Sequence, residues 1–172
     1  MRSILFILII ISTFANGQEL EKNYKDDFTG DSVKRTSWEF LNNASNGFTA
    51  KFRISNIDDH YFLNLKMMIG SSNPKVFSIH EGDKLMFKLS NEEIVELLSS
   101  SSEITCTGCG STGLIGSAAQ GINISYIITK EQFDKLKSTS VSKLRVYTTD
   151  GYVENDVKEK HSKTIQKAFQ LF

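Results

Sequence analysis

The fold is decided by residues 48–69, which read FTAKFRISNIDDHYFLNLKMMI. Apolar and polar side chains alternate along both halves of this segment, and a polar turn from Asn56 to His60 separates the halves. A period of two is typical of a strand with one buried and one wet face. Two such strands joined by a short loop that contains aspartates predict an antiparallel hairpin. We therefore expect a domain built on an antiparallel sheet.

Further stretches of the chain carry shorter versions of the same alternation. We expect strands at 36–40, 76–79, 85–89, 94–98, 122–128, 143–148 and 152–155. In the first of these, Trp38 and Phe40 share a face. Asp150 and Gly151 form a typical hairpin turn before the last.

Two helices are expected near the C-terminus. Thr129 and Gln132 have the spacing of a capping box, which predicts a short helix over 130–137 with Phe133 and Leu136 on its buried side. A second, amphipathic helix is expected over 157–171, with Asp156 as its cap. Its apolar stripe contains Val157, Ile165, Ala168, Phe169 and Phe172, and its wet face carries Lys160, Lys163 and Lys167. The expected strands come early in the chain, the helices come late, and strands and helices do not alternate regularly. This order predicts an α+β fold with about seven to nine antiparallel strands, an arrangement compatible with a sandwich.

The N-terminus has the pattern of a secretory signal peptide over residues 1–17. Arg2 precedes an apolar run from Ile4 to Ile11, and small residues follow, so cleavage is expected between Gly17 and Gln18. The run is too short to cross a bilayer as an anchor, and no later segment is apolar enough to do so. We expect an irregular arm over 18–31, a single globular domain over 32–172, and a location in the periplasm, outside the cell or on its surface.

Composition narrows the function classes. The chain has 20 basic and 20 acidic residues and a formal net charge of zero. Nucleic-acid-binding domains usually show a basic excess, so we expect no nucleic-acid partner. The 40% hydrophobic content and single proline are typical of a globular protein.

The two cysteines, Cys106 and Cys109, are separated by Thr107 and Gly108. A four-residue turn brings its ends close enough for a disulfide, and an exported protein meets an oxidising compartment. A local structural disulfide or an idle thiol pair is therefore one interpretation. A redox-active pair is a second, although such pairs are activated at a helix N-terminus and no helical pattern follows here. A zinc site completed by His60 or His80 is a third.

The same loop contains the spacing Gly108-x-Gly110-x-x-Gly113, formally a dinucleotide fingerprint. The strand–turn–helix context and the acidic residue that the motif requires are missing, so we expect no nucleotide or other cofactor. The three histidines are scattered, and the aspartate clusters lack the spacing of a calcium site, so no metal site is expected there. No catalytic residues can be assigned.

One surface could bind a ligand. Lys51, Arg53, Lys66 and Lys88 occupy polar positions of their strands, where neighbouring strands would gather them into a basic stripe. Such a stripe suits an anionic glycan, a lipid headgroup or an acidic protein, although exposed sheets commonly carry lysines for solubility alone. Asn43 and Asn123 begin glycosylation sequons.

The last third of the chain resembles exported bacterial domains of uncharacterised function that end in strand, short helix, hairpin and helix. The residues that carry the resemblance are Ile124–Thr129, Phe133, Leu136, Lys143–Tyr147 and the Asp150–Gly151 turn. It implies a periplasmic or surface location and no activity. We therefore expect a non-catalytic binding or accessory domain of the cell envelope with an unidentified partner or ligand. The alternative is a thiol-active or metal-binding protein centred on Cys106 and Cys109.

Overall fold

The computed structural model describes residues 19–42, 48–69, 76–109 and 120–172. The predicted hairpin is confirmed: β4 (Phe48–Ile57) pairs antiparallel with β5 (His60–Ile69), in a register that runs from Phe48 opposite Ile69 to Ile57 opposite His60. Asp58 and Asp59 form the turn, both with positive φ. Aspartate is one of the few non-glycine residues that accept this conformation, which explains why the loop is rich in it.

Within the described residues, eleven strands form one antiparallel sheet, and β6 (Ser78–Ile79) pairs with β9 (Glu103–Ile104) in a separate ladder. The main sheet has the order β1-β2-β4-β5-β11-β8-β7-β12-β13, with β3 added to β4 and β10 to β11. The bounds of its other strands are β1 (Leu20–Lys25), β2 (Ser32–Thr36), β3 (Glu39–Asn42), β7 (Lys84–Leu89), β8 (Ile94–Ser99), β10 (Cys106–Thr107), β11 (Gln120–Ile128), β12 (Val141–Thr148) and β13 (Gly151–Asp156).

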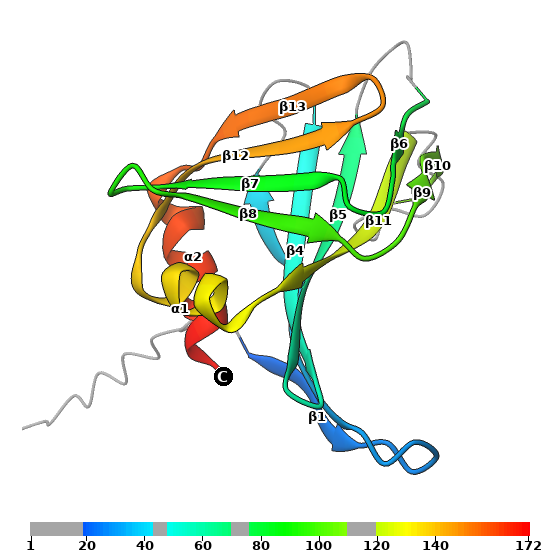
Figure 1. Cartoon of the computed structure of the whole chain (residues 1–172), viewed down its shortest axis with the longest axis vertical. Coiled ribbons are helices and arrows are strands. Elements are labelled where there is room, and N and C mark those ends of the chain that lie inside the picture. Colours follow the sequence, from blue (N-terminus) through cyan, green and yellow to red (C-terminus); the bar gives the residue numbers. More distant parts are fainter. Residues whose placement is uncertain (1–18, 43–47, 70–75, 110–119) are drawn as a thin grey trace, which may run out of the picture.

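The sheet bends over on itself into two layers. In Figure 1, β4, β5 and β11 run across the direction of β7, β8, β12 and β13. Strand β11 makes the connection, because it pairs with β5 along its whole length but with β8 only at Tyr126 and Ile127. A strand that changes layers in this way is the usual corner of an orthogonal packing.

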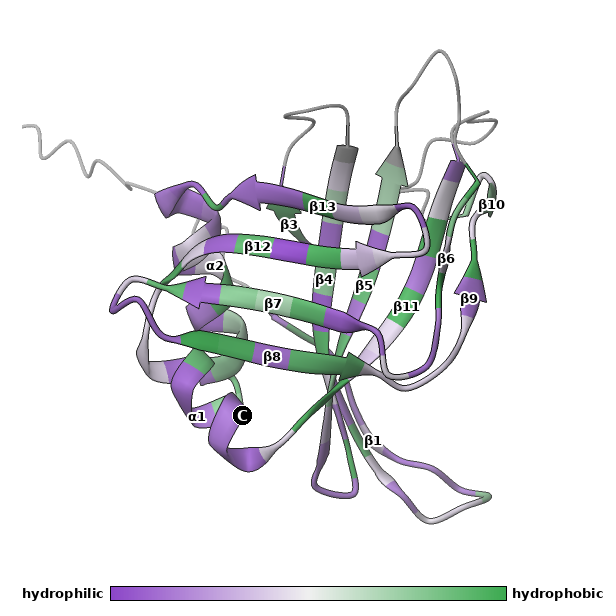
Figure 2. Ribbon diagram, turned by 45° about the horizontal axis from the view of Figure 1, so that its top comes forward, coloured by the Kyte–Doolittle hydropathy of each residue, from purple (hydrophilic) through white to green (hydrophobic). Residues whose placement is uncertain are grey.

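The core fills the space between the layers. Alternation along β4, β5 and β11, visible in Figure 2, directs one set of side chains inward and leaves the other set on the outer face. The inward set includes Ala50, Phe52, Ile54, Leu63, Leu65, Met67, Ile122, Ile124 and Tyr126. From the other layer they meet Leu85, Phe87, Val95, Leu97, Leu144 and Val146. The outer face of the layer formed by β4, β5 and β11 therefore takes no part in packing this core.

Two helices, α1 (Lys130–Ser138) and α2 (Glu159–Gln170), pack together at one end of the layers (Figure 1). The predicted capping box is present, since Thr129 accepts from the amide of Gln132 and the Gln132 side chain accepts from the amide of Thr129. The Phe133 ring lies 4.3 Å from the Tyr61 ring and 5.1 Å from the Phe169 ring, centroid to centroid. This aromatic cluster fastens both helices to β5.

Several expectations differ from the structure. The described residues form more strands than seven to nine, in part because β9 and β10 are only two residues long and show no readable period. The expected strand at 76–79 is shortened to β6. The expected irregular arm contains β1, whose six residues are all exposed and therefore do not alternate. The expected strand at 36–40 is broken between Thr36 and Glu39.

The cap predicted for the last helix is also wrong. Asp156 belongs to β13, and α2 begins at Glu159 after Lys158, which makes no side-chain capping bond. The predicted faces of this helix are nevertheless correct, since Ile165, Ala168 and Phe169 are buried and its lysines are exposed.

Candidate functional site

Three of the four predicted basic residues come together on the outer face of β4 and β5. Lys51 lies opposite Lys66 in the register, and Arg53 is opposite Asn64 on the same face. Directly opposed side chains on one face of a sheet lie about 5 Å apart at Cβ. The hairpin register thus concentrates positive charge that the zero net charge of the chain conceals.

Two aromatic side chains lie against these cations. The Lys66 Nζ is 4.4 Å, and the Arg53 Cζ 4.5 Å, from the centre of the Trp38 ring. The Lys51 Nζ is 4.4 Å from the centre of the Phe40 ring. A cation over an aromatic ring contributes about 0.5–2 kcal/mol, so these contacts hold the cationic groups in place.

Trp38 reaches this position because the chain interrupts its pairing with β4. Arg35 in β2 is opposite Ser55, and Glu39 in β3 is opposite Phe52, so Ser37 and Trp38 bridge a gap between two ladders on the same strand. The Ile54 amide, which loses a backbone partner in this gap, donates instead to Thr36 Oγ1 at 3.0 Å. The sequence placed Trp38 and Phe40 on one face but did not indicate that this face covers Arg53 and Lys66.

A row of hydrogen-bonded polar side chains crosses four strands of the same face. Arg35 Nε donates to Ser55 Oγ (3.3 Å), Ser55 Oγ to Asn64 Oδ1 (2.6 Å), and Asn64 Nδ2 to Ser125 Oγ (2.6 Å). We call Arg35, Ser55, Asn64 and Ser125 the polar row. In the sequence, Asn64 and Ser125 stand at polar positions of alternating segments, which indicates that they lie on the outer face. Their hydrogen-bond partners follow only from the strand order.

Two hollows flank the polar row and share Asn64 and Ser125 in their linings. The first, of about 260 Å³, is lined by Trp38, Arg53, Asn64, Leu65, Lys66, Ser101, Glu103, Asn123, Ile124 and Ser125. The second, of about 280 Å³, is lined by Arg35, Ser55, Ile57, Phe62, Asn64, Ser100 and Ser125. We call the two together the outer groove. The segment that follows β8 supplies one wall of it, and Trp38 supplies another.

The positive charge of the outer groove is only partly neutralised by acidic side chains. Within the described ranges, the ion pair found for Lys51, Arg53 and Lys66 is the one between Arg53 and Glu21, at 3.9 Å. Burial lowers the pKa of Lys66, Arg53 and Lys51 lower it further, and Glu21 acts against them. Burial likewise lowers the pKa of Arg53, with an added contribution from Arg35 that Glu21 opposes. Neighbouring cations contribute to both shifts, and a further negative charge in the groove would oppose that contribution.

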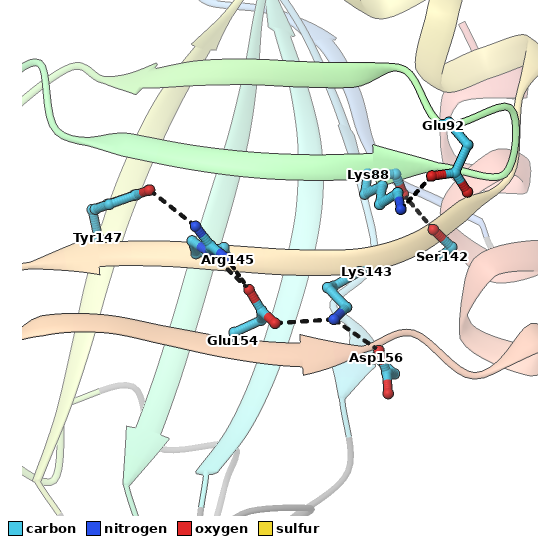
Figure 3. Close-up of polar contacts among 8 residues, drawn as sticks. All are labelled: Lys88, Glu92, Ser142, Lys143, Arg145, Tyr147, Glu154 and Asp156. Atoms are coloured by element: carbon cyan, nitrogen blue, oxygen red, sulfur yellow. Dashed lines mark hydrogen bonds and ion pairs between the residues drawn. The ribbon is translucent and has the colours of Figure 1, made fainter.

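The fourth predicted residue, Lys88, lies elsewhere. It is on β7 in the other layer, where it forms an ion pair with Glu92 (Figure 3). Beside it, Lys143 pairs with Glu154 (3.0 Å) and Asp156 (3.6 Å), and Arg145 also pairs with Glu154. Each cation in Figure 3 has an acidic partner, in the turn after β7 for Lys88 and on β13 for Lys143 and Arg145. The pairs with β13 fasten it to β12, and the cluster has little charge to offer a ligand.

The cysteine pair forms the expected tight turn. The Cα atoms of Cys106 and Cys109 are 5.2 Å apart with their sulfurs in contact, the Cys109 amide donates to the Cys106 carbonyl (3.2 Å), and Gly108 has a φ of 78°. The turn packs closely on β11, because a Cβ added to Gly121 would lie 1.6 Å from the Cys109 carbonyl oxygen.

The alternative chemistry at this turn has less support. His60 is the first residue of β5, next to the β4–β5 turn, and His80 is exposed before β7. Among the residues the structure describes, no three side chains of His, Cys, Asp or Glu group closely enough to hold a metal. Gly110 and Gly113 of the glycine motif lie outside the described residues, as do the signal segment and the Asn43 sequon. Asn123 of the second sequon is exposed on β11 and lines the outer groove.

None of the helices that the structure describes has the length and apolar character needed to span a membrane. Comparison of the chain with protein-family models, curated proteins and solved structures found no match.

Proposed function

We propose that this protein is an exported, non-catalytic binding or accessory domain of the cell envelope that takes an anionic ligand in the outer groove. The observation that carries the proposal is the grouping of Lys51, Arg53 and Lys66 against the rings of Phe40 and Trp38, with Glu21 as their one ion-pair partner within the described residues. A surface kept only for solubility would spread or pair these charges, as the cluster around Glu154 does. The export pattern of residues 1–17 supports the location.

A thiol-active protein is the competing function, and the closeness of Cys106 and Cys109 is the observation in its favour. Activated thiols of this spacing lie at a helix N-terminus or beside a cation. Here Cys106 belongs to strand β10 and is opposite Gly121 of β11. The pair therefore has the surroundings of a structural turn.

Charge reversal tests the anionic ligand. The variant Lys51→Glu/Arg53→Glu/Lys66→Glu should lose retention on heparin, on vesicles with anionic headgroups and on immobilised polyphosphate, whichever of these the wild type binds at low salt. Surface electrostatics of this kind weaken with salt, so retention of the wild type should fall as salt is added.

The matched control is Lys88→Glu/Lys160→Glu/Lys167→Glu, which changes the net charge equally but lies on β7 and α2. The control should be retained like the wild type. Equal losses in both triple variants would show a general charge effect and contradict the proposal. Circular dichroism checks the fold, and the milder pair Lys51→Gln/Lys66→Gln should give an intermediate loss.

A further inference from the structure

We propose that the outer groove holds a linear oligosaccharide bearing carboxylates, of the uronic-acid type, which crosses the polar row from one hollow to the other and places a carboxylate beside Lys51, Arg53 and Lys66. This rests on the proposed function and adds the class of ligand. The polar row runs from β2 through β4 and β5 to β11. Its members Asn64 and Ser125 line both hollows, so a ligand that fills both hollows contacts them.

The chemistry of the groove changes along its length. One end is cationic and aromatic, with Arg53, Lys66 and Trp38. The other end is lined largely by hydroxyl and amide groups, from Ser55, Asn64, Ser100 and Ser125, beside Arg35. Hydroxyls and amides both donate and accept hydrogen bonds, which matches the hydroxyls of a sugar. A ligand that combines carboxylates with many hydroxyls fits this gradient better than one that carries charged groups alone.

The acidic side chains in and near the groove favour the same class of ligand. Glu103 lines the first hollow, and Glu21 approaches Arg53. A carboxylate only accepts hydrogen bonds, so it suits sugar hydroxyls and repels closely spaced phosphates. Polyphosphate and nucleic acid are therefore poor occupants.

The recessed position of the charge disfavours flat surfaces. The Arg53 side chain is only 21% exposed, beneath Trp38, and it also donates from Nε to Asn64 Oδ1 at 3.4 Å. A bilayer or a flat protein face would meet the rim of the groove without reaching the polar row. A narrow chain can enter, and Trp38 offers an aromatic plane with a polar edge for a sugar ring to pack on.

Isothermal titration calorimetry at low salt can test the ligand class with four probes: a tetramer of galacturonic acid, a neutral hexose tetramer, inorganic polyphosphate and anionic vesicles. The acidic tetramer should bind at least tenfold more tightly than each of the others. The variant Asn64→Ala, which interrupts the polar row and keeps every charge, should weaken the acidic tetramer at least fivefold. Ser125→Ala should weaken it in the same direction, and the control Asn23→Ala, on exposed β1, should not.

The outcomes separate the two proposals. Binding of polyphosphate or vesicles without the acidic tetramer overturns the oligosaccharide and leaves the anionic site standing. Equal binding of the neutral and acidic tetramers removes the role of the carboxylate. No binding of any anionic probe overturns both proposals. Unchanged affinity in both Asn64→Ala and Ser125→Ala, with the fold intact, overturns the placement of the sugar across the polar row.

Discussion

At the scale of single residues, the surroundings of Cys106 and Cys109 bear on the choice between a structural and a reactive pair of cysteines. Their turn is short, Gly108 supplies the positive φ that such a turn needs, and the Cys109 carbonyl packs on Gly121. These contacts hold the cysteines close whether or not a partner ever attacks the bond. We therefore assign the pair to the structure of the β10–β11 hairpin rather than to a reaction.

The double variant Cys106→Ser/Cys109→Ser tests that assignment. Closing so short a loop removes little entropy from the unfolded chain, so the free energy of unfolding should fall by no more than about 2 kcal/mol. Retention on the anionic matrix should not change. Urea unfolding with and without reductant measures the first quantity, and loss of ligand retention in the folded variant would favour a thiol-active protein.

At the scale of elements, the imidazole of His161 connects α2 to β3. Only 5% of this residue is exposed, and it makes a hydrogen bond with the backbone of Phe40. Burial lowers its pKa, the nearby Lys160 and Lys158 lower it further, and the bond to Phe40 opposes them. The folded protein therefore binds the His161 proton less tightly than the unfolded chain does. In the unfolded chain the pKa of a histidine side chain is near 6.5.

The sign of the pH dependence follows from this difference. Above pH 6.5 the imidazole is neutral in both states, so it carries no penalty. As the pH falls below 6.5 the unfolded chain takes up the proton first, and stability declines toward the lower pKa of the folded state. The urea midpoint should drop between pH 7.5 and 5.5, and His161→Gln should reduce that slope. His80→Gln, at an exposed site, is the control, and an equal slope in His161→Gln would contradict the account.

Sequence patterns predicted the elements that are regular over six or more residues and half-buried. The β4–β5 hairpin, the capping box at Thr129 and the faces of α2 are examples, because each is encoded by contacts close in sequence. β1 was missed because all its side chains are exposed, and the Asp156 cap failed because that residue remains in the β13 ladder.

At the scale of the whole molecule, the groove depends on the order of strands that are distant in sequence. Position in an alternation showed that Lys51, Arg53, Lys66 and Lys88 face solvent, but only the sheet order separates Lys88 from the others. The meeting of β2, β4, β5 and β11 creates the polar row. The gap between β2 and β3 places Trp38 over Arg53 and Lys66. No local pattern contains this information.

The most direct test uses the single tryptophan of the chain, since Trp38 lines the outer groove and its fluorescence reports on that site alone. A heparin-derived hexasaccharide should be titrated at low salt into the wild type and both triple variants. We predict a saturable change in Trp38 emission in the wild type and in the Lys88→Glu/Lys160→Glu/Lys167→Glu control, and none in Lys51→Glu/Arg53→Glu/Lys66→Glu. Unchanged emission in a wild type that is nevertheless retained on heparin would place the binding elsewhere and contradict the account.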